Sequence, residues 1–110
     1  MKLPNGHRAE LGDKLEEYCL NADHPRGKNK ARVFKSALGI TVANAYLLRD
    51  AILGAAATSA EIRETGDNGY GMTYQMIFRM ESHAGSAAVM TGWIVEKGTN
   101  FPRLTTCYIL

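Results

Sequence analysis

Hydrophobic and polar residues follow two different periods along this chain. In the first half, apolar residues recur at spacings of three and four, which is typical of amphipathic helices. This spacing predicts helices over about 11–20, 27–38 and 42–57. In the second half, apolar and polar residues alternate, which predicts strands over about 59–65, 70–81, 86–96 and 103–110. The sequence therefore predicts three helices followed by four strands.

Residues that cap helices or make turns stand at the boundaries of these elements. Pro25 breaks the chain after the first helix, Gly39 can end the second, and Thr41 can cap the third. The Asn68-Gly69 pair is typical of the tight turn of a hairpin. Because the strands are joined by short connections, we expect an antiparallel sheet. The predicted fold is α+β, with about three N-terminal helices packed on one face of a four-stranded antiparallel sheet.

Composition places the chain among folded globular proteins. Its 110 residues are enough for one hydrophobic core, and we expect a single domain over 1–110. A hydrophobic content of 45% with 22% charged residues argues against disorder. The net charge is only +2, so any attraction to nucleic acid must depend on how the charges are distributed.

The two cysteines, Cys19 and Cys107, lie far apart in apolar-flanked segments, and their spacing fits neither zinc ligands nor a redox pair. We expect both to be buried free thiols. The first residues lack the apolar stretch of a signal peptide, and no run approaches the roughly 20 apolar residues of a membrane helix. The sequence therefore predicts a cytoplasmic protein with no membrane association.

A basic segment is the most distinctive feature of the chain. No acidic residue occurs between Asp23 and Asp50, whereas cations are frequent from Arg26 onward. On a helical wheel, the outward cations separate from an apolar face, but Lys30 falls within the apolar arc. Its long stem could follow the core and bring the ammonium group out at the helix end. Cations in a first helical turn also oppose the helix dipole, which is a mild indication of function.

The sequence contains no Walker loop, dinucleotide fingerprint, metalloprotease motif or nucleophile elbow, and it predicts neither a cofactor nor a metal. Cleavage of RNA without a metal needs a proton acceptor, a proton donor and cations that stabilise the phosphate. Residues that could supply these groups occur in the basic segment and the last strand. The candidate catalytic residues are His24, Lys30, Thr105 and Thr106. The candidate phosphate-binding residues are Arg26, Lys28 and Arg32.

Each of these residues also has a purely structural interpretation. His24 could bond to the backbone of its turn, Lys28 and Arg32 could belong to a solvated helix face, and strands favour threonine for packing reasons alone. Two other functions therefore stay open. One is a non-catalytic interaction module of the immunity or adaptor type, which would bind a protein partner or a second copy through its sheet face or edge. The other is a small-ligand pocket between helices and sheet.

Five segments together resemble the small bacterial family DUF6883 over nearly the whole chain. They are KLPN at 2–5, LEEYCLN at 15–21, HPRGKNKARVF at 24–34, GWI at 92–94 and FPRLTTCY at 101–108. Domains of this family occur alone or at the ends of long secreted or phage-related proteins, a placement that implies toxin domains. The order of helices and strands is also similar to that of the barnase, EndoU, colicin and RelE group of metal-independent ribonucleases, which is a likeness of architecture alone.

The resemblance also marks one departure from the family pattern. Relatives are expected to carry a histidine where this chain has Asn29. If that histidine acted as the general base, this chain would have lost the activity or would rely on His24.

Overall fold

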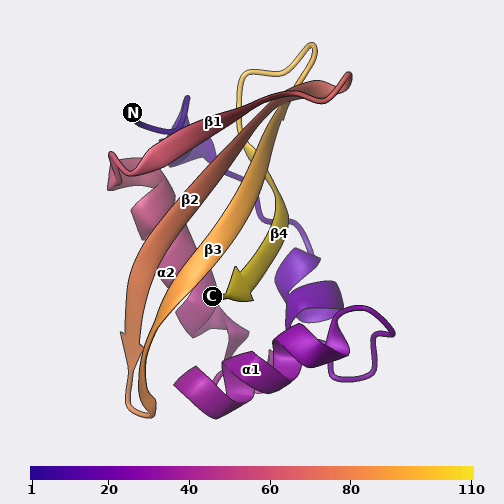
Figure 1. Ribbon diagram of the computed structural model, residues 1–110, viewed down its shortest axis with the longest axis vertical. Coiled ribbons are helices and arrows are strands. Elements are labelled where there is room, and N and C mark those ends of the chain that lie inside the picture. Colours follow the sequence, from indigo (N-terminus) through magenta and orange to yellow (C-terminus); the bar gives the residue numbers. More distant parts are fainter.

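The computed structural model describes residues 1–110 and confirms the α+β fold (Figure 1). All four strands form one antiparallel sheet in the order β1-β2-β3-β4. The strands are β1 (Ile62–Asp67), β2 (Gly71–Ser82), β3 (Gly85–Glu96) and β4 (Arg103–Ile109). The two α-helices are α1 (Lys28–Leu38) and α2 (Ala45–Thr58). Three short helical turns accompany them, η1 (Gly6–Arg8), η2 (Leu15–Cys19) and η3 (Val42–Asn44).

The first predicted helix is much shorter than expected. Only η2 is helical in this region, and it has the wide turn of a π-helix. Gly12, with φ of 54°, interrupts the chain before it, and Glu10 is extended because it forms a parallel bridge with Arg103 at the edge of β4. The apolar spacing from Leu11 onward therefore reflects two separate contacts with the core and not one continuous helix.

Gly39 ends α1 as the sequence predicted, whereas α2 begins later than expected, at Ala45, after the short η3 turn. Gly39 has φ of 65° at the end of α1, and its N–H donates to the carbonyl of Lys35. Thr41 caps the η3 turn that leads into α2, where its hydroxyl accepts a hydrogen bond from the N–H of Ala43. Asn44 donates its side-chain amide back to the carbonyl of Gly39, so the two helices are tied together at a sharp corner.

The core lies between the helices and one face of the sheet. Alternate residues of β2 and β3 face it, and Trp93 is 1% exposed at its centre. The indole N–H of Trp93 donates to the hydroxyl of Thr91, which in turn donates to the carbonyl of Met76. This pair of hydrogen bonds satisfies the only buried polar side chains near the tryptophan and fixes its ring.

A bulge in β4 changes which of its residues face the core. Gly92 pairs with Thr106 and Trp93 pairs with Leu104, so Thr105 is the extra residue. Leu104 and Cys107 are consequently both buried although they are three positions apart. Strict alternation along a strand could not have given this pattern.

Figure 1 shows how the helices are placed around the sheet. Helix α2 passes behind β2 and β3, and α1 lies across the lower end of the molecule, beside the end of β4. The η2 turn lies next to β4, and residues 20–27 form a loop that leads from it into α1. The start of α1 therefore meets both η2 and the edge strand β4, and this junction contains most of the predicted site.

Candidate functional site

Lys30 extends from the first turn of α1 to β4. Its ammonium group donates to the hydroxyl of Tyr18 at 2.9 Å and to the hydroxyl of Thr106 at 3.0 Å. Tyr18 belongs to η2 and Thr106 to β4, so this one cation joins three elements. The position fits the prediction that the stem of Lys30 follows the core while its ammonium group leaves at the helix end.

No carboxylate neutralises this ammonium group. The two ion pairs of the protein join Arg49 to Glu16 and Arg103 to Glu96, and neither includes Lys30. Two aromatic rings supply part of the missing stabilisation, because the ammonium nitrogen lies 4.4 Å from the ring centre of Tyr18 and 5.4 Å from that of Tyr108. A half-buried cation with neutral partners keeps much of its field available to an incoming anion.

Tyr18 is the centre of a cationic cluster. Besides Lys30, the ammonium nitrogen of Lys14 lies 5.7 Å from the ring centre. The ring of His24 packs edge-on against Tyr18 with 4.8 Å between ring centres. Since Lys30 donates to the phenol oxygen, the phenol proton is free to be donated to a ligand.

Close contact of the backbone holds this cluster together. A side-chain carbon added to Gly27 would lie 2.0 Å from the carbonyl oxygen of Tyr18, far inside van der Waals contact. Only glycine allows the start of α1 to come this near to η2. The approach fixes the distance across which Lys30 reaches Tyr18.

His24 has a role at the start of α1 that limits its chemistry. Its Nδ1 accepts hydrogen bonds from the N–H groups of Arg26 at 3.0 Å and Gly27 at 2.9 Å. The N–H of Lys28 donates to the carbonyl of His24, and Pro25 follows it directly, so the imidazole occupies the place of an N-cap side chain. In this geometry the ring is neutral, with its proton on Nε2. It can donate a hydrogen bond from Nε2, but it has no free nitrogen lone pair with which to accept a proton.

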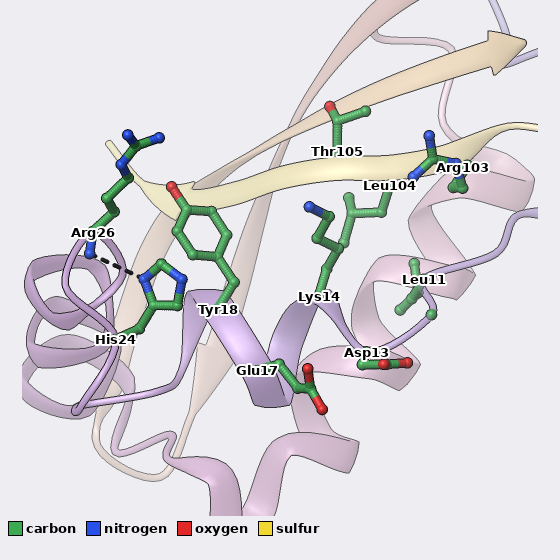
Figure 2. A pocket seen from close by; sticks show the side chains of 11 residues that line it. Leu11, Asp13, Lys14, Glu17, Tyr18, His24, Arg26, Arg103, Leu104 and Thr105 are labelled. Atoms are coloured by element: carbon green, nitrogen blue, oxygen red, sulfur yellow. Dashed lines mark hydrogen bonds between the residues drawn. The ribbon is translucent and has the colours of Figure 1, made fainter.

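An open cleft of about 720 Å³ lies beside the cluster (Figure 2). Its walls come from residues 11–18, the turn at 24–26 and the start of β4. In Figure 2 the phenol of Tyr18 rises toward β4, with Arg26 at one end of the cleft and Arg103 at the other. Cations of the wall therefore outnumber its acids, since Lys14, Arg26 and Arg103 face only Asp13 and Glu17.

The structure brings some of the candidate residues together and separates others. His24, Arg26 and Thr105 line the cleft, and Lys30 and Thr106 meet beside it. The side chain of Thr105, however, lies on the far side of the β4 ribbon and points away from Tyr18 (Figure 2). Its hydroxyl lies over Gly92 of β3, 3.1 Å from where a side-chain carbon would be.

Lys28 and Arg32 are exposed on the outer face of α1 and do not line the cleft. Their positions match the solvated helix face that was the alternative interpretation of both residues. The cations at the junction are therefore Arg26 and Lys30 from the basic segment and Lys14 from outside it.

Three residues of the cleft were not predicted from the sequence, namely Tyr18, Lys14 and Arg103. Tyr18 falls within the predicted helix over 11–20, and its spacing gives no reason to place it beside Lys30. Tyr18 and Arg103 both occur in segments that carry the family resemblance, which is the one signal that could have identified them. Arg103 is held by Glu96 through a 2.9 Å ion pair on the neighbouring strand.

The two cysteines are buried side by side next to this junction. Both are free thiols with 0% exposure, as the sequence predicted. The hydrogen bond from the thiol of Cys107 lowers the pKa of Cys19, and the same bond, together with burial, raises the pKa of Cys107. The positive charge of Lys30 acts to lower the pKa of both thiols, but at Cys107 the hydrogen bond and burial outweigh it.

The structure contains neither a cluster of metal-binding side chains nor a helix that could cross a membrane. No three His, Cys, Asp or Glu side chains gather where they could hold a metal ion. Neither α1 nor α2 combines the length and apolar character that a membrane crossing requires.

Comparison with protein families identifies the chain. A model described as "Domain of unknown function (DUF6883)" matches residues 2–110. The chain belongs to the DUF6883 family. No curated protein and no solved structure match this DUF6883 domain, so the likeness to metal-independent ribonucleases has no support from known structures.

Proposed function

We propose that this DUF6883 domain binds RNA phosphate at the junction of η2, α1 and β4, as a metal-independent, ribonuclease-like domain of the toxin type. The observation that carries the proposal is Lys30, a half-buried cation that has two hydroxyl partners and no carboxylate. A phosphate oxygen is the kind of ligand that would complete its environment. Arg26 and Lys14 at the cleft would add long-range attraction for a polyanion.

The chemistry of cleavage assigns roles to these groups. The ribose 2′-oxygen would attack the phosphorus atom while the bond to the 5′-oxygen breaks. Lys30 would stabilise the negative charge on the phosphate oxygens, and Tyr18 would donate its phenol proton to the leaving oxygen. A base must also accept the 2′-hydroxyl proton. His24 could do so only after its Nδ1 leaves the N–H groups of Arg26 and Gly27.

The occupied Nδ1 of His24 favours a second candidate function, in which the domain binds RNA or a protein partner without cleaving it. In that case His24 caps α1, and the cleft serves only for recognition. Asn29 fits the same alternative, because an asparagine cannot replace a histidine base. A small ligand with an anionic group is a third occupant that a cleft of about 720 Å³ would accept.

Incubation with total RNA and with tRNA in the presence of EDTA tests the catalytic proposal. We expect the wild-type protein to produce fragments that end in cyclic or 3′-phosphate. Lys30→Met should abolish cleavage because it keeps the stem but removes the charge, and Tyr18→Phe should slow it about 100-fold. Lys28→Met is the matched control, since it removes an exposed cation of the same helix, and should cleave normally.

Intact RNA with the wild-type protein would exclude cleavage. RNA that is retained without being cut would support the binding function and leave His24 as a cap. Equal loss in the Lys28→Met and Lys30→Met variants would indicate that only the total charge matters, which contradicts a site at the junction.

We also propose a cytoplasmic location. Two adjacent thiols that stay unpaired are typical of a reducing compartment, in which disulfides rarely form. Trapping of free thiols with a maleimide after denaturation of whole cells would test this, and a Cys19–Cys107 disulfide would contradict it.

A further inference from the structure

β2 is longer than the neighbour on its outer side. β1 pairs only with the part of β2 from Met72 to Met76, whereas β2 continues to Ser82. Figure 1 shows the lower end of β2 with β3 on one side and no strand on the other. The segment 77–82 is therefore an open edge at the end of a strand whose first part is paired on both sides.

The hydrogen-bonding direction along this edge follows from β3. The carbonyl of Ala88 accepts a hydrogen bond from the N–H of Leu110, so the polar backbone groups of Ala88 point toward β4. Ala88 lies opposite Arg79, which makes this a non-hydrogen-bonded pair of the antiparallel ladder. The N–H and C=O of Arg79 consequently point away from β3, and alternation gives Ile77 and Glu81 the same direction. No strand pairs with the outward N–H and C=O groups of these three residues.

A groove runs beside this open edge. It has a volume of about 700 Å³ and lies between α2 and the end of β2. Leu47, Ala51 and Ala55 of α2 form one wall, and Phe78 and Met80 of β2 form the other. An added strand would therefore find unpaired backbone groups at its side and apolar side chains beneath it, the two requirements of strand addition.

We propose that the open edge of β2 pairs with the same edge of a second copy of this chain, so that the two sheets join antiparallel into one. Only residues whose backbone groups point outward can exchange hydrogen bonds, and two of the registers that this allows pair nearly the whole open segment of each copy. One places Arg79 opposite Arg79 of the second copy. The other places Arg79 opposite Glu81 of the second copy, with Met80 on the two-fold axis.

Charge and the position of β1 both favour the second register. It puts each Arg79 beside a carboxylate on the outer face of the joined sheet, whereas the first register opposes two guanidinium groups. It pairs residues 78–82 of the two copies, whereas the first register pairs residues 77–81. Continued by one residue, the first register would bring Ser82 of the second copy opposite Met76, where Ile62 of β1 already lies.

Sedimentation analysis over a protein concentration series tests the proposal through a charge swap. Arg79 and Glu81 are exposed, so their substitution should leave the fold intact, which a thermal melt checks. We expect wild-type protein to dimerise. R79E and E81R should each weaken dimerisation on the order of tenfold, because each creates two pairs of like charges. The R79E/E81R double variant should restore it.

A hydrogen-exchange readout locates the contact independently. At a protein concentration that favours the dimer, the amides of Arg79 and Glu81 should exchange more slowly than in dilute protein, while the amide of exposed Tyr70 should not change. A monomer at every concentration would overturn the proposal and would leave the edge to an extended segment of another protein. A dimer that is insensitive to the charge swap would also overturn it.

Discussion

Gly27 illustrates how a single residue determines the geometry of the site. Gly27→Ala would force the start of α1 away from the carbonyl of Tyr18, and we expect a loss of about 2–3 kcal/mol in the free energy of unfolding. Gly54→Ala is the matched control, because no atom lies within 4 Å of the added carbon. Alanine there should stabilise the middle of α2 by about 0.5–1 kcal/mol. Urea unfolding of both variants measures the difference, and equal stabilities would contradict the close approach.

Glu16 and Arg49 form an ion pair that gives the fold a pH dependence. Burial raises the pKa of Glu16, but the 2.6 Å hydrogen bond from Arg49, the backbone and the positive charge together lower it below its ordinary value. A lowered pKa contributes stability above the ordinary value, and this contribution is lost as the pH falls through the lowered pKa. Because both side chains are about one-third exposed, we expect a contribution of only about 0.5 kcal/mol.

The comparison of wild-type protein with Arg49→Met at pH 7 and pH 3 measures this contribution. The wild type should be the more stable of the two at pH 7, and the difference should become smaller at pH 3, because protonation of Glu16 removes the charge that pairs with Arg49. A difference of the same size at pH 7 and at pH 3 would show that Arg49 acts through packing and not through the charge of Glu16.

At the scale of elements, the sequence predicted α1, α2 and the four strands because each has its own local signal. Gly39 and Thr41 mark helix boundaries, and alternation marks β2 and β3. The error at 11–20 arose where local spacing and tertiary contacts disagree. Glu10 pairs with Arg103, a residue 93 positions away in the chain, and no periodicity can report such a bridge.

The position of His24 before α1 yields a prediction about its role as a helix cap. His24→Ala removes the acceptor of two N–H groups and should cost about 1 kcal/mol of unfolding free energy. His24→Asn provides a side-chain oxygen at the same place and should recover most of that loss. Thermal or urea unfolding of the two variants checks this, and RNA cleavage by the same proteins separates the roles. An active His24→Asn variant would identify the imidazole as a cap, whereas a stable but inactive one would assign it to the reaction.

At the scale of the whole molecule, the sequence indicated where Lys30 points but not which side chains it meets. The inward position of Lys30 on the helical wheel was a local signal, and its ammonium group does leave the helix at the junction. Tyr18 and Thr106 lie 12 and 76 positions away along the chain, and only the fold brings them to Lys30. The direction of Thr105 was equally hidden, because it depends on the bulge opposite Gly92.

The comparison of Lys30, which points inward, with Lys28, which points outward, gives the most direct test of the proposed phosphate site. Both Lys28 and Lys30 belong to the first turn of α1, yet only Lys30 meets Tyr18 and Thr106. The two methionine variants therefore carry the same net charge and differ only in where the charge is lost. Thermal melts of both proteins show that each is folded before RNA is added.

The measurement is the affinity for a labelled single-stranded RNA, followed by fluorescence anisotropy over a series of salt concentrations. We expect Lys30→Met to weaken binding by about tenfold or more and to reduce the salt slope by about 0.7, the value for one lost phosphate contact. Lys28→Met should weaken binding by less than about twofold. Equal affinities for the two variants, or no binding by the wild-type protein, would contradict a phosphate site at the junction of η2, α1 and β4.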